Sequence, residues 1–235
     1  MRVVPASAAS PMAPSPPRKS PVPRASLRAS FRTWPGSKIA LMLGLTLGIC
    51  GPYFLLQRVE LFPRWQVPVL AIDRAIPFLP GWTPVYLSVC ALVPLSILAA
   101  RRRADLVAFG QALAGLCAVH YVGFLLLPSV GPRPHLDEVA ALSRSYAWLV
   151  SVDGARNAFP SLHAALTVFC MGFALRVAGT GAGIGLRTAG FAWGGAILFA
   201  TLATRQHYFL DILAGALLGG IAHAGAARLA HRARG

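Results

Sequence analysis

The sequence predicts an all-α integral membrane protein, a six-helix transmembrane bundle that follows a disordered basic tail. Two observations support this fold class. Of the 235 residues, 56% are hydrophobic and only 12% are charged, which is too apolar for an ordinary soluble domain. Several runs also reach the roughly 18–20 apolar residues that a helix needs to cross a bilayer.

Two regions are expected along the chain. Residues 1–37 are rich in Pro, Ser, Ala and Arg and lack apolar periodicity, as is typical of disordered segments. Residues 38–232 contain the apolar runs and are predicted to form one membrane domain. No cleavage pattern of a signal peptide precedes the first long run, so this run is interpreted as a retained span.

Each of six apolar runs is predicted to cross the membrane once. Gly51-Pro52 is expected to kink the first run and Pro94 to bend the second. The last run is rich in small residues, which let helices pack closely. The six predicted spans are Ile39–Leu56, Trp82–Ala100, Leu106–Leu127, Ser161–Leu175, Leu186–Ala203 and Tyr208–Leu229.

Between the first two spans, the stretch Trp65–Leu79 is apolar but too short to cross a bilayer, and it is interrupted by prolines and an aspartate. We expect it to lie at the membrane interface or to re-enter the membrane. Tyr86, near the start of the second span, is interpreted as an interfacial aromatic residue.

The charge pattern orients the predicted spans. The net charge is +15, but the basic residues are not interleaved with aromatic residues that stack on bases, which argues against nucleic-acid binding. With the N-terminus in the cytoplasm, the inner segments carry 15 basic residues and one acid, whereas the outer segments carry seven and six. This asymmetry satisfies the positive-inside rule and predicts that both termini are cytoplasmic. The Ala-, Arg- and Gly-rich composition is typical of a high-GC bacterium, so a plasma (inner) membrane is expected.

That orientation places four polar residues on the outer face, although nearly eighty residues separate the first from the last. Arg133 follows the third span, His163 begins the fourth, and His207 and Asp211 lie where the fifth meets the sixth. If a helix includes both of the last two, their spacing puts them on one face, where the carboxylate fixes the tautomer of the histidine. Two histidines beside a membrane indicate acid–nucleophile chemistry on a lipid-borne substrate.

Three motifs at these positions resemble a known family. They are GPRP at Gly131–Pro134, FPSLH at Phe159–His163 and HYFLD at His207–Asp211. In their order and in the six-span layout they resemble the signature motifs of the type-2 phosphatidic acid phosphatase superfamily. The forms NAFPSLH and QHYFLD are most similar to the branch that contains inositol phosphorylceramide synthase. The resemblance covers roughly residues 39–230.

The resemblance implies a role for each motif residue. His207 attacks phosphorus and forms a phosphohistidine, Asp211 orients its imidazole, and His163 gives a proton to the leaving oxygen. Arg133 and Ser161 bind the phosphate. These residue types suit those roles, since an arginine fork matches phosphate oxygens and a serine N-cap stands beside free helix N–H groups that attract anions.

The chain departs from the commoner phosphatase pattern at three positions. Leu126, Leu162 and Thr201 stand where that pattern has lysine, glycine and arginine, respectively. Two phosphate-binding cations are therefore missing. Arg205 and Arg156, both expected on the outer face near the motifs, are hypothesised to replace them.

Neither a metal ion nor another cofactor is predicted. The outer acids Asp137, Glu138 and Asp153 lack the spacing with the histidines that metal ligands require. The four cysteines lie inside apolar runs without a disulfide framework or metal-ligand spacing. We interpret them as small buried hydrophobic residues.

The predicted function is a metal-independent membrane enzyme that cleaves a lipid-linked phosphoester or pyrophosphate at the outer face, that is, a lipid phosphate phosphatase. One alternative is a phosphotransferase that passes an inositol phosphate-like head group to a lipid alcohol. Both activities share the first half of the reaction, and pocket shape and water exclusion decide which acceptor completes it. Another alternative is a non-catalytic membrane protein that binds or transports lipids. The expected partners are a lipid phosphate or pyrophosphate and membrane lipids, with the oligomeric state left open.

Overall fold

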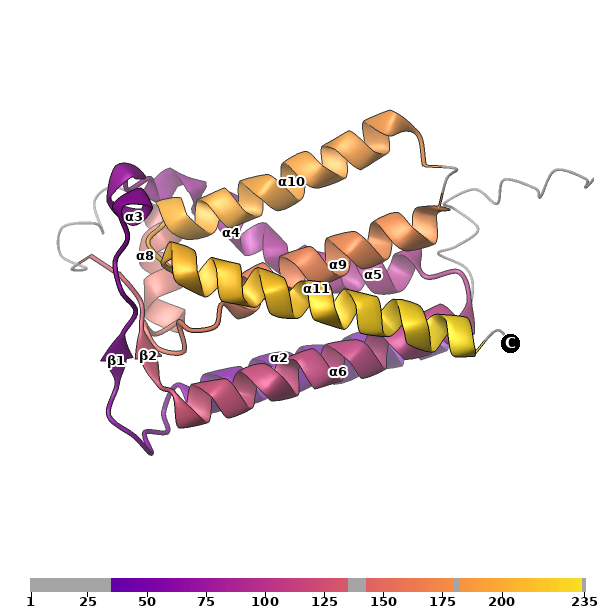
Figure 1. The fold of residues 1–235 in the computed structure, drawn as a ribbon, viewed down its shortest axis with the longest axis horizontal. Coiled ribbons are helices and arrows are strands. Elements are labelled where there is room, and N and C mark those ends of the chain that lie inside the picture. The colour runs from indigo at the N-terminus through magenta and orange to yellow at the C-terminus, as the bar shows by residue number, and fades with distance from the viewer. Residues whose placement is uncertain (1–34, 135–142, 180–181, 234–235) are drawn as a thin grey trace, which may run out of the picture.

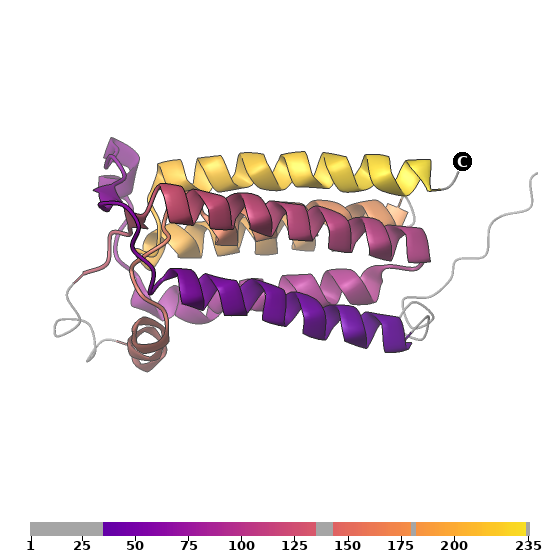
Figure 2. The same ribbon diagram turned by 90° about the horizontal axis from the view of Figure 1, so that it is seen from below.

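The computed structural model describes residues 35–134, 143–179 and 182–233, which are mostly helical, as predicted. The long helices run side by side along one axis, and the two strands and some of the short helices gather at one end of them (Figures 1 and 2). The predicted disordered tail, apart from its last residues, and the outer acids Asp137 and Glu138 lie outside the described residues. The long helices are α2 (Pro35–Leu56), α6 (Arg103–Leu126), α9 (Leu162–Ala178), α10 (Ile184–Ala203) and α11 (Phe209–Arg232).

The second predicted span is a series of short helical segments. Just before Pro94, the tight turn η2 interrupts the α-helix. Proline favours such an interruption because it lacks an N–H group and its ring crowds the carbonyl four residues earlier. The segments are η1 (Pro80–Trp82), α4 (Thr83–Leu87), η2 (Ser88–Ala91) and α5 (Leu92–Ala99).

The short elements that close one end of the bundle come from two connections. Strands β1 (Trp65–Gln66) and β2 (Ser129–Val130) pair in parallel, with Trp65 opposite Ser129. Helix α3 (Ala71–Ala75) follows β1, and α8 (Arg144–Val152) precedes α9. Figure 2 shows α8 end-on, so it lies across the axis of the long helices. The stretch expected at the interface therefore contains β1 and α3.

Five helical stretches of the described chain are long and apolar enough to cross a membrane. They are Pro35–Leu56, Pro80–Ala99, Arg103–Leu126, Ile184–Ala203 and Phe209–Arg232. The sixth predicted span corresponds to α9, which is apolar but only 17 residues long, so the count of six is not confirmed. Helix α9 has a buried apolar side, whereas α2 and α10 expose large apolar side chains such as Leu47 and Phe191. Exposed apolar helices of this length are typical of a membrane protein.

Helices α9 and α11 approach each other through glycine. A Cβ atom on Gly215 would overlap the carbonyl oxygen of Ser161, and one on Gly219 would overlap that of Ala165. The close packing predicted from the small residues of the last span is therefore confirmed. The contact also joins the starts of the two helices, because the Ser161 N–H donates to the Asp211 carbonyl at 3.0 Å.

We expect Gly215→Ala to lower the free energy of unfolding by about 1–3 kcal/mol, because the added methyl group pushes α9 away from α11. Gly220→Ala is the matched control on the same helix, since a Cβ there meets open space. Thermal unfolding of the two detergent-purified variants measures the difference. Equal stability of both variants would contradict the close contact.

Candidate functional site

The loop of residues 153–161 joins the parts of the candidate site. It is bound to the chain around β2, because Gly131 N–H donates to the Ala155 carbonyl at 2.8 Å. Phe159 N–H donates to Ser129 Oγ at 2.7 Å. These bonds hold the loop against β2 and the first residue of GPRP, although more than twenty residues separate the bonded residues in sequence.

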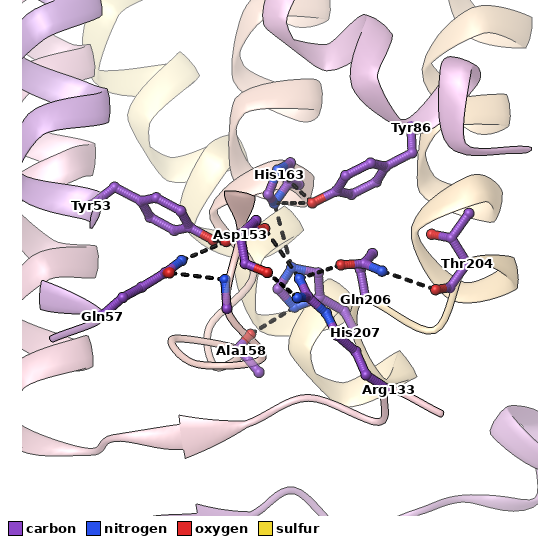
Figure 3. Close-up of polar contacts among 11 residues, drawn as sticks. Tyr53, Gln57, Tyr86, Arg133, Asp153, Ala158, His163, Thr204, Gln206 and His207 are labelled. Carbon is purple, nitrogen blue, oxygen red and sulfur yellow. Dashed lines mark hydrogen bonds and ion pairs between the residues drawn. The ribbon is translucent and has the colours of Figure 1, made fainter. Parts of the chain in front are cut away.

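The two motif histidines lie next to each other at this end of the bundle (Figure 3). His207 Nε2 is 3.4 Å from His163 Nδ1, and their ring centroids are 5.6 Å apart. His163 lies in the first turn of α9, and His207 stands two residues before α11. The contact between the helix starts therefore sets the distance between the two rings.

Hydrogen bonds on the far sides of both rings fix their orientation. His207 Nδ1 donates to the Ala158 carbonyl at 2.8 Å, so in the neutral ring the lone pair is on Nε2, which faces His163. The Tyr86 hydroxyl lies 2.8 Å from His163 Nε2. Tyr86 is only 1% exposed, which corrects its interpretation as an interfacial aromatic residue.

Asp211 lies behind His207 but not on a shared helix face. Helix α11 begins at Phe209 with Tyr208 as its N-cap, so His207 precedes the helix and the predicted helical pairing is wrong in this respect. Asp211 Oδ2 accepts from Tyr208 N–H at 2.9 Å and lies 3.5 Å from His207 Nδ1. The carboxylate thus caps the helix and also places a negative charge behind the imidazole.

Arg133 is held by groups from two other segments. Its guanidinium donates to the carboxylate of Asp153 at 3.2 Å, to the Asp153 carbonyl and to Gln206 Oε1. The Arg133 and Asp153 side chains are each 9% exposed. Within the described ranges Arg133 Nε has no hydrogen-bond partner, so one charged donor is unused.

Asp153 connects Arg133 to helix α2. Its Oδ1 accepts from the Tyr53 hydroxyl at 3.0 Å and from Gln57 Nε2. Figure 3 shows this carboxylate between the α2 side chains and the arginine. In the sequence, Asp153 looks like a scattered loop acid, and nothing local marks it, because its partners on α2 lie about a hundred residues earlier.

The predicted phosphate-binding residues Ser161 and Arg156 both lie at the site. Ser161 is the N-cap of α9, as expected, and its hydroxyl accepts from Ala164 N–H at 3.2 Å. Arg156 donates to the Gln57 carbonyl at 2.7 Å and lines a small polar cavity beside His207. The residues around that cavity are Tyr53, Tyr86, Arg133, Asp153, Gly154, Ala155, Arg156, Ala158, Gln206 and His207.

Arg205 does not line this cavity. Its guanidinium donates to the carbonyls of Asp73 and Ile76 at 2.6 and 2.8 Å, so it provides hydrogen-bond donors for carbonyl groups at the C-terminal end of α3. Asp73 in turn accepts from Phe209 N–H at 2.7 Å and caps α11. Burial and the nearby Asp211 and Asp73 carboxylates raise the pKa of the Tyr208 hydroxyl beside this cap, so Tyr208 is neutral.

An apolar cavity of about 300 Å³ reaches the histidine pair from the other side. Tyr53, Tyr86 and Asp153 line both cavities, so the polar and apolar spaces meet at these residues. His207 lines only the polar cavity, and His163 only the apolar one. The remaining residues around the apolar cavity are Thr46, Ile49, Cys50, Phe54, Leu87, Val89, Cys90, Val93, Pro94, Trp148, Leu149, Val152, Leu162 and Leu166.

A family model described as the PAP2 superfamily matches residues 82–225, more than half of the chain. The chain belongs to the PAP2 superfamily. Members of this superfamily are typically phosphatases or phosphotransferases that act on lipid phosphates. Searches of curated proteins and of solved structures gave no match. In the described part of this PAP2 protein, no group of three or more His, Cys, Asp or Glu side chains is placed to hold a metal ion.

We expect Asp153→Ala to lower the free energy of unfolding by about 3–5 kcal/mol, because it leaves the Arg133 charge buried without its partner. Glu60→Ala is the control, since it removes an exposed partner of Arg64, and it should cost at most about 1 kcal/mol. Denaturant unfolding in detergent compares the two variants. If both lose the same small amount, the Asp153–Arg133 pair does not hold the site together.

Proposed function

We propose that this protein is a membrane-embedded lipid phosphate phosphatase that cleaves a phosphoester or pyrophosphate through a phosphohistidine on His207. The observation that carries the proposal is the His163–His207 pair, which stands between a polar cavity containing Arg133 and an apolar cavity. An amphiphile with a phosphate at one end and a hydrocarbon chain at the other matches these two environments. Membership of the PAP2 superfamily supports the same class of reaction.

In the first half of the reaction, His207 Nε2 attacks phosphorus and displaces the leaving oxygen. The ring can do this because Nδ1 carries the proton that it donates to Ala158, which leaves the Nε2 lone pair free. The imidazole gains positive charge as the N–P bond forms. The Asp211 carboxylate, 3.5 Å from Nδ1, stabilises that charge.

His163 is proposed to give the leaving oxygen its proton. Because His163 lines the apolar cavity, the oxygen nearest to it is the one that carries the hydrocarbon chain. The phosphate then stays on His207 while the lipid alcohol departs. In the second half, His163 takes a proton from the attacking acceptor. The Tyr86 hydroxyl supports both states of His163, since Nε2 keeps its proton and donates to Tyr86 while Nδ1, which faces His207, loses and regains one.

The phosphate oxygens are proposed to bind Arg133 and the start of α9. The unused Nε of Arg133 and the N–H groups that follow Ser161 are suited to an anion. The nitrogens of His207 and His163 are 3.4 Å apart, which leaves no room for phosphorus between them. Substrate binding therefore requires the two rings to separate, as is common for catalytic contacts that change on binding.

We place the site on the outer, periplasmic side of a bacterial plasma membrane. The proposal rests on the positive-inside rule, since the basic segment Arg101–Arg103 lies at the opposite end of the bundle from the histidine pair. Both chain termini are then cytoplasmic.

A phosphotransferase is the second candidate, and the charge of the polar cavity favours it. Arg133 and Arg156 line that cavity with one carboxylate, Asp153, which leaves a net charge of +1. That charge matches a phosphodiester monoanion, such as an inositol phosphate-bearing lipid, better than a phosphomonoester dianion. The forms of the second and third motifs also resemble the inositol phosphorylceramide synthase branch. Transfer of the head group to added ceramide or diacylglycerol identifies a transferase, whereas phosphate release unaffected by these alcohols identifies a phosphatase.

We expect His207→Ala and His163→Ala each to lower turnover by at least about 100-fold, because one removes the nucleophile and the other the acid. The assay uses detergent-purified protein in EDTA, since no proposed step needs a metal, with phosphatidic acid, polyprenyl pyrophosphate and phosphatidylinositol as substrates. Acid-labile phosphate should label the parent protein but not His207→Ala. His231→Ala, at the other end of the bundle, is the control.

Full activity of both histidine variants would refute the mechanism. Loss of activity in EDTA that Mg²⁺ restores would also refute it.

The apolar cavity gives a second prediction. Cys90→Trp fills part of the cavity with an indole, so we expect a KM at least about fivefold higher for a long-chain lipid phosphate, equivalent to about 1 kcal/mol of lost apolar contact. The KM for a short-chain phosphate should be unchanged. Leu95→Trp, on the exposed side of α5, is the control. Equal effects on both chain lengths would show that the chain does not occupy this cavity.

A further inference from the structure

A third cavity lies where α6 begins and α9 ends. These helix ends are at the end of the bundle opposite the start of α9, which carries His163 (Figure 1). The cavity has a volume of about 260 Å³. The residues that line it are Arg101, Arg102, Asp105, Arg176 and Val177. Neither the proposed reaction nor the superfamily motifs use any of these residues.

Arg176 is held in place by two contacts, but two of its guanidinium donors have no hydrogen-bond partner among the described residues. Its Nη1 donates to Asp105 Oδ1 at 3.2 Å, and its guanidinium carbon lies 5.1 Å from the centre of the Phe173 ring. These contacts fix the plane of the fork. Yet Nε and Nη2 are buried and have no hydrogen-bond partner among the described residues. Buried donors on a charged group are costly to leave unpaired, so an acceptor at this position would be bound favourably.

The shape and charge of the cavity specify the acceptor. Three arginines and one carboxylate line it, so two positive charges are in excess. The edge of a guanidinium that presents two N–H groups matches two oxygens of a phosphate. Asp105 already occupies Nη1 of Arg176, so the free donors are left for a second anion.

We propose that this cavity binds the phosphate of an anionic membrane lipid. The cavity lies where α5 and α6, both parts of apolar spans, meet at the basic end of the bundle, which is the level of lipid head groups. A lipid can place its phosphate between the arginines while its chains remain against the apolar helices. An ion pair that merely fastened α6 to α9 would need only the Asp105 contact and would leave the free donors of Arg176 without a purpose.

The test measures lipid retention by the full chain in detergent, using native mass spectrometry. The probes are phosphatidylglycerol, phosphatidylcholine and inorganic phosphate. We expect phosphatidylglycerol to bind more tightly than phosphatidylcholine or inorganic phosphate. In the double variant Arg101→Gln/Arg102→Gln, its affinity should fall about tenfold or more, because each arginine near lipid phosphate contributes about 1 kcal/mol. Arg176→Gln should reduce the affinity as well.

Arg228→Gln is the matched control, because Arg228 is an exposed arginine of α11 toward the same end of the bundle and lies outside the cavity. Its affinity for phosphatidylglycerol should stay at the parent value. Equal loss in the control and the double variant would show a general charge effect and overturn the site. Equal binding of phosphatidylcholine, or inorganic phosphate binding as tightly as the lipid, would overturn the assignment to an anionic lipid.

Discussion

The arrangement of the site depends on the close backbone contact between α9 and α11. Gly215 and Gly219 allow this contact, and the hydrogen bond from Ser161 to the Asp211 carbonyl extends it to the helix starts. One motif histidine follows the first of these starts and the other precedes the second. The rings therefore meet because two backbones do, and His163 within α9 and His207 just before α11 are both anchored to rigid helix starts. The same contact brings the α9 N-terminus, with its free N–H groups, beside His207.

Charge compensation explains why the polar network extends well beyond the motifs. A guanidinium buried in a membrane protein needs a partner, and Asp153 supplies it to Arg133. The carboxylate then needs donors for its remaining oxygen, which Tyr53 and Gln57 supply from α2. At the two positions where cations are missing, Leu126 is half exposed and the Thr201 hydroxyl donates to a carbonyl of its own helix. The site therefore has few positive charges, and a carboxylate balances one of its two arginines.

The sequence predicted the residues whose signals are local. The arginine of GPRP and the two motif histidines lie at one end of the bundle, as the apolar runs and charge asymmetry indicated. The start of α11 was predicted to within one residue, but the pairing of His207 with Asp211 on one helix face was wrong, because an aspartate that caps a helix and one that pairs within it look alike in sequence. Tyr86 and Asp153 were missed because His163, the partner of Tyr86, is nearly eighty residues away, and Tyr53, a partner of Asp153, is about a hundred residues away. Ala158 acts through its carbonyl oxygen, so its side chain carries no signal at all.

The division of the histidines between two cavities bears on which acceptor ends the reaction. His207 lines the polar space and His163 the apolar space, so in the proposed reaction the leaving lipid alcohol departs on the side of His163. After departure, the group that His163 is placed to deprotonate is whatever occupies that apolar position. A second lipid alcohol fits there by its chain, whereas water must arrive through a space that is small and lined by paired polar groups. In the proposed reaction, the choice between hydrolysis and transfer therefore depends less on the two histidines, which serve both, than on how quickly the apolar cavity is refilled.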